Sequence, residues 1–400
     1  MVIDIRLDDE IKKQFDEICK REGLPSDMAV IGFAKTVVSE CKIPFMIGMD
    51  PNYKRNKLKE IAAKRYANQI NMTLDNYPEE EHEQLREKII NDICDIEQTT
   101  NFIPFEYFRM NMCCMDKKDW LNEYLSDGDT YVMSDRLNDK NVGFDVSDKY
   151  EIYKFYQEYY KRDVARVKDM SEMHEFYRLL IKHKKVLIKP LKGSLGQGVE
   201  VVSIMDTKKD PKFAENMLKN YPQGILVEEL IDQHPVMTSL NPPSSNTLRI
   251  MTINLDDEIR VYPALRIGTT DSITDALSRG GITGRVDIET GEILEVRNSS
   301  GKRFVTNPGC GAQLLGIKIP DIKGAIDLAK ELAAKMPKYR YIGFDIALTK
   351  KGWVMIEFNG KAGVVCVQTA LGHGLKQEVI EIFEKLGKPT DFPRRPPRKI

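Results

Sequence analysis

The sequence predicts an α+β protein whose sheets are largely antiparallel, with a helix-rich region before them. From Val186 onward, short segments rich in β-branched residues alternate with turns, and one clear helix, 322–336, stands among them. Before that point, the region 51–135 has apolar residues at spacings of three and four, as at Leu85 and Ile89, which is typical of amphipathic helices. The predicted strands are 186–189, 199–204, 224–230, 248–255, 259–267, 344–349 and 353–358.

Composition and charge narrow the class of protein. With 400 residues, of which 42% are hydrophobic, the chain is long enough for two or three domains with their own cores. No apolar run approaches the roughly 20 residues that span a bilayer. The N-terminus also lacks the basic start and apolar stretch of a signal peptide, so we expect a cytoplasmic protein with no membrane partner. The 60 basic and 61 acidic residues give a formal net charge of −1, which provides no global electrostatic reason to bind nucleic acid.

The cysteines and the C-terminal tail carry no predicted chemistry. Seven cysteines are scattered without C-x-x-C spacing, which suggests neither a disulfide framework nor a zinc site. The tail 389–400 is basic and rich in proline, so we expect a solvated end, with a lid or a partner contact as the alternative.

The N-terminal 47 residues are expected to form a small unit. Residues 3–7 alternate apolar and polar, as in a strand, and apolar residues then recur at helical spacing from Ile11 to Ile18, up to Gly23. A second helix is expected over 28–41. A strand and two helices of this size bury little apolar area alone, so the unit needs a partner.

Over residues 1–47, including the closing segment 43–45, the sequence resembles the ribbon-helix-helix module of Rel-type antitoxins. The resemblance implies that two chains pair their N-terminal strands, so we expect a homodimer. In that family the outward residues of the ribbon read the DNA major groove, and in this chain they would be Asp4 and Arg6. Because a carboxylate facing phosphates weakens such reading, we predict dimerisation without DNA. Dimerisation with DNA binding and a chance resemblance are the alternatives.

The stretch 186–202 joins two apolar strands through a lysine, a proline and a glycine-rich turn. Three glycines within 193–198 give a loop whose backbone N–H groups can close over a phosphate chain, because no side chain blocks the approach. Lys189, at the end of the first strand, can place a positive charge on those phosphates. A Walker or a Rossmann loop would lead into a helix, whereas a strand follows this loop. A plain glycine-rich hairpin is the alternative.

A second constellation lies in the segment 341–363, where the turn 350–352 joins two strands. Glu357 and Asn359 are two residues apart, so both side chains leave the same face of the second strand, and Asp345 can lie opposite them. Two carboxylates and an amide oxygen are suitable ligands for Mg²⁺. The alternative is a solvated acidic pair, but the apolar flanks indicate a half-buried sheet, on which unpaired carboxylates would be costly.

The order of strand, lysine, glycine loop and strand resembles the ATP-grasp superfamily, in which two α+β subdomains clasp ATP. A His-Pro pair, S-x-N-T-x-R-I, L-R-x-G and G-G-I then follow in the order of its sugar-transfer-associated branch, and the resemblance covers about residues 140–375. It implies a hinge strand at 225–231 whose backbone meets the adenine edge. The residues implied to bind the nucleotide are Lys149, Lys189, Lys192, Gly193, Ser194, Gly196, Gly198, Val199, Glu228, Glu229, Leu230 and His234.

Two positions depart from what the resemblance leads us to expect. Many relatives outside the branch have a glutamate shortly after the hinge, where this chain has His234 and Pro235, so the residue that holds the ribose stays open. Asp275 stands where the branch more often shows Asn beside Asp, which leaves the contact with the acceptor open.

Four further residues are candidates for the reaction itself. Arg249 and Arg266, on neighbouring strands, are suited to a bidentate grip on the transferring phosphoryl group or on a carboxylate. We expect Asn246 and Arg279 to orient the substrate, with an ordinary surface arginine as the alternative at Arg279.

The resemblance implies an ATP-dependent carboxylate–amine ligase that activates the acid as an acyl phosphate and releases ADP. The expected cofactors are ATP and Mg²⁺, with two ions expected and Mn²⁺ as a possible substitute. The substrates would be a small-molecule carboxylate and an amine, in polysaccharide or specialised-metabolite synthesis. A phosphotransferase on the same fold and a DNA-binding regulator with an ATP-sensing domain are the alternatives. The expected segments are a dimerisation module (1–47), a helix-rich segment (48–140), two ATP-grasp subdomains (141–232 and 233–388) and the tail (389–400).

Overall fold

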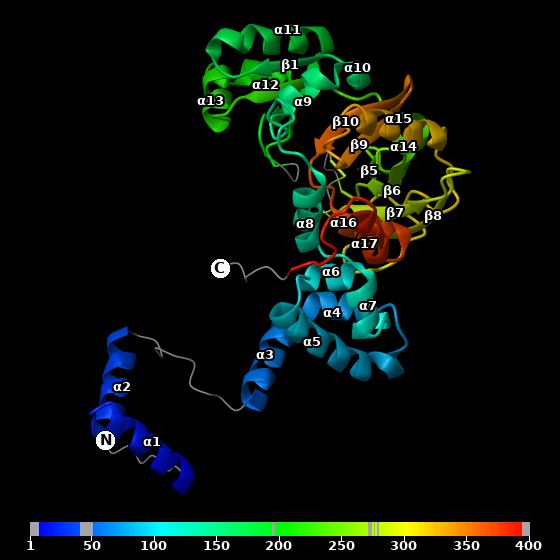
Figure 1. The fold of residues 1–400 in the computed structure, drawn as a ribbon. Helices are drawn as coiled ribbons and strands as arrows, with labels where there is room; N and C mark the ends of the chain where they lie inside the picture. The colour runs from blue at the N-terminus through cyan, green and yellow to red at the C-terminus, as the bar shows by residue number, and fades with distance from the viewer. Residues whose placement is uncertain are drawn as a thin grey trace. The chain divides into compact units, whose positions relative to one another are not determined.

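The computed structural model describes residues 8–40, 51–193, 197–270, 274–275, 277 and 280–393. The chain divides into two units, Met1–Ile61 and Ala62–Ile400 (Figure 1). Several predictions fall on residues outside the described ranges and stay predictions: the strand 3–7, the segment 43–45, Ser194, Gly196 and Arg279.

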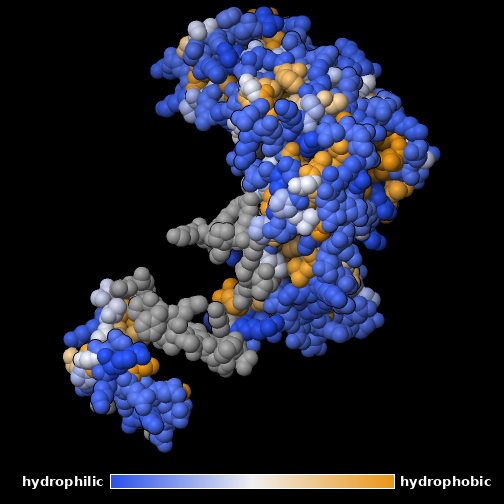
Figure 2. All heavy atoms as spheres, in the orientation of Figure 1, coloured by the Kyte–Doolittle hydropathy of each residue, from blue (hydrophilic) through white to orange (hydrophobic). Residues whose placement is uncertain are grey.

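The first unit contains helices α1 (Asp9–Arg21) and α2 (Ser26–Glu40), and α3 (Pro51–Arg65) begins in it. Asp8 caps α1 by accepting a hydrogen bond from the N–H of Ile11 at 2.9 Å. Gly23 follows this helix with a φ of 68°, a left-handed conformation that suits glycine. Both predicted helices are confirmed. Apolar side chains remain exposed on the unit (Figure 2), namely Ile11, Ile18, Leu24, Met28, Ile31 and Val38.

The second unit begins with a helical region that has an aromatic core. Trp120 and Tyr107 are fully buried, and the ring of Phe102 meets that of Trp120 edge to face at 5.3 Å. The helix-rich character predicted for this region is confirmed. Its elements are α4 (Ala67–Leu74), η1 (Glu79–Glu81), α5 (His82–Thr99), α6 (Pro104–Arg109), η2 (Met112–Cys114), α7 (Lys117–Glu123) and α8 (Asp127–Leu137).

A four-stranded sheet follows, with the strand order β1-β4-β2-β3. Helix α11 packs on it, so that Phe176 and Leu179 share an apolar core with Val186 and Val227. The elements of this part are α9 (Lys149–Phe155), α10 (Gln157–Tyr160), β1 (Val164–Val167), η3 (Met170–Glu172), α11 (Met173–His183), β2 (Lys185–Pro190), β3 (Glu200–Ser203), α12 (Ile204–Lys209), α13 (Phe213–Asn220) and β4 (Ile225–Glu229).

A six-stranded sheet forms the second part, with the order β10-β9-β5-β6-β7-β8. Leu248 and Ile250 of β5 pack with α15 in the larger apolar core, and α16 packs over β6 and β7. The elements are α14 (Pro235–Leu240), β5 (Thr247–Asn254), β6 (Ile259–Ile267), β7 (Ile282–Val286), β8 (Ile293–Arg297), α15 (Ile322–Ala334), β9 (Tyr341–Thr349), β10 (Gly352–Asn359), α16 (Val364–Leu371) and α17 (Lys376–Lys385).

The predicted α+β class is confirmed, and the ladders between the named strands are all antiparallel. Every predicted strand has a counterpart, whereas β1, β7 and β8 were not predicted. None of the helices in the described part of the chain is both long and apolar enough to cross a bilayer.

Candidate active site

Strand register brings charged side chains together across three strands. Arg249 on β5 is the partner of Asp345 on β9, and Asp345 is in turn the partner of Glu357 on β10. Directly opposed residues of antiparallel strands share a face, so these three side chains lie on one side of the sheet. That side is opposite to α15, because the flanking Leu248 and Ile250 point into the core with that helix.

A β-bulge sets this register. Met355 pairs with Ile346, but the next pair joins Glu357 to Asp345, so Ile356 is the extra residue. Without the bulge, Ile356 would lie opposite Asp345. The expected meeting of Asp345 with Glu357 therefore occurs, but through a local irregularity that residue spacing does not reveal.

Asp345 is held by two arginines. Its carboxylate accepts hydrogen bonds from Nε and Nη2 of Arg249, the latter at 2.8 Å, and from Nη1 of Arg266 at 3.1 Å. Burial acts to raise the pKa of Asp345, but the two guanidinium groups outweigh it and hold the pKa below its ordinary value. The carboxylate is therefore ionised at neutral pH. Asn359, on the same hairpin, donates through Nδ2 to the carbonyl oxygen of Gly343 at 3.3 Å.

Arg266 bridges two buried carboxylates, those of Asp275 and Asp345. Its Nη2 lies 2.8 Å from Oδ1 of Asp275, and the hydroxyl of Thr247 donates to Oδ2 of Asp275 at 2.5 Å. Burial raises the pKa of Asp275, an effect that Arg266 partly offsets. The Nε atom of Arg266 is buried and has no hydrogen-bond partner among the residues that the structure describes. Such a donor is costly to leave unpaired, which suits a site that binds an acceptor group.

Lys149 connects the glycine turn to the acidic hairpin. It begins α9 directly after Asp148, whose side chain caps the helix by accepting from the N–H of Tyr150 at 2.8 Å. Its Nζ donates to the carbonyl oxygen of Gly193 at 2.6 Å and lies 3.6 Å from Oε1 of Glu357. The turn after β2 and the β9–β10 hairpin thus meet at one ammonium group, although more than 160 residues separate them in sequence.

Lys189 is fixed by a second buried carboxylate, Glu228. Its Nζ lies 2.8 Å from Oε1 of Glu228, and Nη2 of Arg162 lies 2.5 Å from Oε2. Burial acts to raise the pKa of Glu228, but Arg162 and Lys189 together lower it to about 2. Arg162 also donates to the carbonyl oxygen of Met355 at 2.7 Å, which ties the four-stranded sheet to β10. The side chain of Glu228 therefore positions Lys189.

Sequence comparison decides the family of this chain. A family model described as sugar-transfer associated ATP-grasp matches residues 122–384, which is more than half of the chain. The chain belongs to this family. No curated protein matches the chain in sequence.

Solved structures of ATP-grasp type resemble the chain only distantly. The D-alanine–D-alanine ligase of Helicobacter pylori has 11% identity and a TM-score of 0.41, with 66% of this chain and 70% of that one covered. An N5-carboxyaminoimidazole ribonucleotide synthetase has 14% identity and a TM-score of 0.34, with 54% of this chain covered. The match spans only 45% of the length of that synthetase. Such distant similarity does not establish an activity.

The glycine turn of this ATP-grasp protein is described in part. Gly193 has a φ of 133° and Gly198 a φ of 68°, conformations that favour glycine. A Cβ on Gly198 would also come within 2.9 Å of the Pro190 ring, so only glycine fits there. Lys192 is half exposed and lies 2.8 Å from Asp145, on the surface of the turn. Val199 is partly buried and directly precedes β3.

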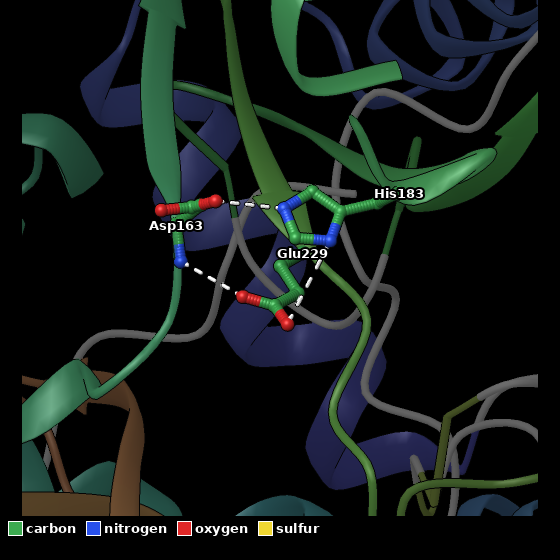
Figure 3. Close-up of side chains that lie close together, drawn as sticks. All are labelled: Asp163, His183 and Glu229. Carbon is green, nitrogen blue, oxygen red and sulfur yellow. Dashed lines mark hydrogen bonds and ion pairs between the residues drawn. The ribbon is translucent and has the colours of Figure 1, made fainter. Parts of the chain in front are cut away.

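The predicted hinge ends in a group that we call the hinge clamp, formed by Asp163, His183 and Glu229 (Figure 3). Oδ2 of Asp163 lies 2.7 Å from Nε2 of His183, and Oε1 of Glu229 lies 3.7 Å from Nδ1. The carboxylates thus contact opposite ring nitrogens, whereas a metal ion would take only one of them. We interpret the group as a tie between β1, α11 and β4. The β4 ladder ends at Glu229, and Leu230 follows with 39% of its surface exposed.

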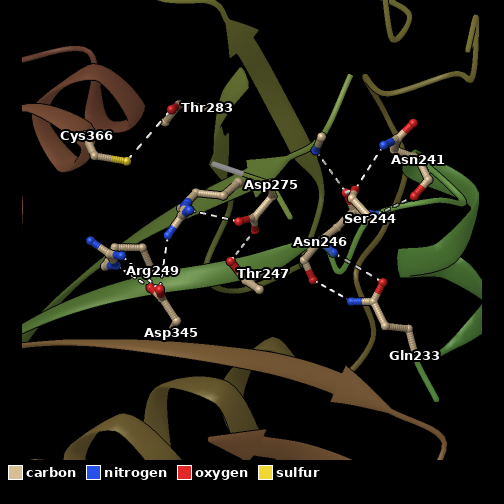
Figure 4. Close-up of polar contacts among 12 residues, drawn as sticks. Gln233, Asn241, Ser244, Asn246, Thr247, Arg249, Asp275, Thr283, Asp345 and Cys366 are labelled. Atoms are coloured by element: carbon tan, nitrogen blue, oxygen red, sulfur yellow. Dashed lines mark hydrogen bonds and ion pairs between the residues drawn. The ribbon is translucent and has the colours of Figure 1, made fainter. Parts of the chain in front are cut away.

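His234 and Asn246 make contacts within the protein. His234 accepts a hydrogen bond from the N–H of Val236 through Nδ1 at 3.3 Å and so caps α14. Asn246 is fully buried, with Nδ2 donating to the carbonyl oxygens of Met237 and Asn241 at 2.7 and 3.2 Å. Its Oδ1 accepts from Ser244 Oγ at 2.9 Å and from Gly268 N at 3.1 Å (Figure 4). All donors and acceptors of this amide are used, so direct substrate contact would break a complete network.

Sequence reasoning did not single out Arg162 or Thr247, and it noted Asp275 only as a departure from a pattern. Arg162 precedes a short strand that was itself missed, so nothing in its spacing marked it as the partner of Glu228. The partnership of Asp275 with Arg266 depends on tertiary contact. The one available signal was chemical, because an arginine predicted on a buried strand requires a carboxylate partner.

Proposed function

We propose that the protein is an ATP-dependent ligase that joins a carboxylate to an amine through an acyl phosphate. The observation that carries the proposal is the contact of Lys149 with both Gly193 and Glu357. It supports a phosphate-binding role for the glycine turn and a metal-binding role for the hairpin. Cationic groups from one side and carboxylates from the other then border a single space that suits a metal-bound triphosphate.

In this proposal the phosphates of ATP are bound by Lys149, Lys189 and the backbone of the glycine turn. Adenine would contact the backbone at Glu228 to Leu230, where the β4 ladder ends. Asp345, Glu357 and Asn359 would hold Mg²⁺, which neutralises triphosphate charge when bound. Glu357 is more available than Asp345, since 35% of its side chain is exposed against 6%, and among the described residues its ion-pair contact is at 3.6 Å. Nucleotide contacts of Lys192, Ser194, Gly196, Gly198, Val199 and His234, and one or two ions with Mn²⁺ as a substitute, remain part of the proposal.

The proposed reaction needs positioning and charge neutralisation, and it needs no covalent enzyme intermediate. A carboxylate oxygen of the acid attacks the γ-phosphorus of ATP, the bond to the β,γ-bridging oxygen breaks, and ADP leaves. The amine nitrogen then attacks the acyl carbon, the carbon–oxygen bond to phosphate breaks, and one proton leaves the nitrogen. Arg249 and Arg266 can stabilise the negative charge on the transferring group, and Asn246 and Arg279 would support the substrate-binding segments.

The family description favours a carbohydrate-linked substrate, so we propose a sugar acid or an amino acid as the acid or the amine. The test is a screen of paired carboxylates and amines for Mg²⁺-dependent ADP release in the presence and absence of hydroxylamine. Hydroxylamine converts an acyl phosphate into a hydroxamate, so a ligase yields hydroxamate when the amine is left out. A stable phosphorylated product with no hydroxamate would instead identify the rival phosphotransferase.

We further propose that the protein is a cytoplasmic homodimer joined through its N-terminal unit. The exposed apolar side chains of α1 and α2, such as Ile11 and Ile31, support this because a small two-helix unit buries little apolar area alone. Sequence-selective DNA binding in a gel-shift assay at physiological salt would favour the regulator instead.

A further inference from the structure

The helical region inserts a buried arginine, Arg109, next to the arginines of the six-stranded sheet. Arg109 is the last residue of α6, which precedes the residues 122–384 that match the family. Its exposed fraction is 6%, and its Nη2 donates to Oγ1 of Thr283 at 3.2 Å. This bond uses one of the five N–H donors of a guanidinium group. Within the described part of the chain, Arg109 forms no ion pair.

Thr283 places Arg109 on the same face of the sheet as the candidate active site. Thr283 on β7 is the strand partner of Arg266 on β6, so their side chains share a face. The Sγ atom of Cys366, near the start of α16, lies 3.8 Å from Oγ1 of Thr283 on that face (Figure 4). Arg266 also contributes the buried Nε that has no partner. Two arginines with unused donors are therefore neighbours at one end of the site.

The nearest carboxyl groups compensate the charge of Arg109 poorly. Asp127 is close enough for Arg109 to influence its pKa, which burial raises, but its carboxylate accepts the N–H of Val365 at the start of α16. Glu106 stands one turn before Arg109 on α6, and burial followed by the charge of Asp127 raises its pKa to about 8. Its two carboxyl oxygens accept the backbone N–H groups of Ile103 at 2.9 Å and of Asp127 at 2.7 Å, so they are committed to partners other than Arg109. A buried guanidinium with such partners is costly unless an anion binds it.

The position along the sheet indicates which anion this is. The strand order β10-β9-β5-β6-β7 separates Glu357 from Thr283 by four strand spacings, or roughly 19 Å at about 4.8 Å each. That distance is too great for the phosphoryl group bound near Glu357 to reach Thr283. The group bound by Arg109 is therefore distinct from the transferring phosphoryl group, and Arg266, which also contacts Asp345, lies between the two.

We propose that Arg109, Thr283 and Nε of Arg266 form a binding site for a second anionic group, of the carboxylate class, on one of the substrates. This inference rests on the proposed function for the identity of the reaction, but anion binding itself does not depend on it. The site would restrict the enzyme to substrates that carry a negative charge away from the bond being formed. Helix α6 lies outside the residues that match the family model, so Arg109 would add a specificity determinant from the preceding helical region.

The test measures thermal unfolding of the full chain with malonate as the probe and MgADP as a separate arm. Wild type should be stabilised by malonate relative to sodium chloride at the same ionic strength. Arg109→Gln should lose at least half of this shift, Arg109→Lys should lose part of it, and both should keep the MgADP shift. Arg260→Gln is the matched control, because Arg260 is also on β6 but pairs with Glu378.

The melting temperature without ligand separates binding from a structural role. Removing an uncompensated charge should leave the melting temperature of Arg109→Gln unchanged or higher than that of wild type. A fall of several degrees, or equal malonate shifts in wild type and Arg109→Gln, would overturn the inference. If MgADP does not raise the melting temperature of wild type, that result counts against the proposed function. The malonate shifts of wild type and Arg109→Gln then still decide whether the anion site exists.

Discussion

Glu228 and Asp345 are two buried carboxylates on central strands, and each pairs with two cations. Glu228 and its partners Arg162 and Lys189 are nearly closed to solvent, with 1%, 5% and 10% of the side chains exposed. Asp345 stands beside Glu357, whose side chain is 35% exposed and has only a long contact with Lys149. Both carboxylate oxygens of Glu228 contact a cation. The Asp345 cluster, in contrast, lies next to the accessible carboxylate oxygens of Glu357.

This difference separates a supporting group from a reactive one. The Glu228 cluster joins both sheets, because Arg162 also donates to the carbonyl oxygen of Met355 on β10. It can hold Lys189 in place, but both oxygens of the Glu228 carboxylate already contact a cation. The Asp345 cluster shares its face with Glu357 and with Arg266, whose Nε has no hydrogen-bond partner among the described residues, so we propose that this cluster accepts a metal ion and an anionic substrate. Substitutions in the two clusters should therefore have different consequences.

The largest effect is expected for Glu357→Gln. The change removes one negative oxygen from the proposed metal site, and loss of several kcal/mol of charge stabilisation lowers the rate by about a hundredfold or more. Mg²⁺-dependent ADP formation measures this, with the melting temperature as a check of the fold. Glu258→Gln, at an exposed glutamate directly before β6, serves as the control and should keep full activity. Unchanged turnover in Glu357→Gln would remove the metal assignment.

Glu228→Gln should chiefly affect stability. The change leaves Arg162 and Lys189 buried with no opposing charge, and breaking a buried pair in this way costs about 3–5 kcal/mol. Urea unfolding followed by circular dichroism gives the free energy of unfolding of the variant and of wild type. A loss below about 1 kcal/mol would mean that water solvates this cluster in solution.

The acid stability of the same cluster gives a smaller, independent effect. The folded-state pKa of Glu228 lies near 2, below its ordinary value of 4.5, so its stabilisation is present above pH 4.5 and is lost as the pH falls toward 2. Over this pH range, ionised Glu228 is expected to contribute about 3 kcal/mol to the free energy of unfolding. The difference in unfolding free energy between wild type and Glu228→Gln should therefore shrink between pH 4.5 and 2. A constant difference across that range would contradict the depressed pKa.

Deletion of residues 1–47 should have the smallest effect on the reaction. The variant should have less than half the mass of the wild-type dimer in light scattering, because it is shorter and monomeric. The rate of ADP formation per chain should be unchanged, because no candidate site residue lies in that segment. Val38→Asp should weaken the dimer in the full chain, since Val38 is 77% exposed. A monomeric wild type would refute the dimerisation role.

Much of this fold could be predicted, because the predicted strands combine β-branched residues with clear turns. Helices α1, α2, α5 and α15 follow from apolar periodicity and end signals that are local in sequence. The short strands β1, β7 and β8 were missed because each includes a charged residue and owes its place to its neighbours.

The candidate site likewise contains residues that the sequence marks and residues that it does not. Asp345, Glu357 and Lys189 stood out because a two-residue spacing or a glycine turn marks them in sequence. Arg162, Asp275 and Arg109 did not, since each matters through a partner far along the chain. Asn246 is the opposite case, because the sequence predicts that it orients the substrate. Its side-chain amide makes four hydrogen bonds within the protein, and these contacts indicate a supporting position.

The central claim is that the glycine turn after β2 and the β9–β10 hairpin border one nucleotide site. A crystal structure of the full chain with Mg²⁺ and a non-hydrolysable ATP analogue tests it most directly. We predict that the triphosphate lies between Lys149 and Lys189 on one side and Glu357 on the other, with metal density at the Glu357 carboxylate. Nucleotide bound elsewhere, or metal density at the hinge clamp of Asp163, His183 and Glu229 alone, would contradict the claim.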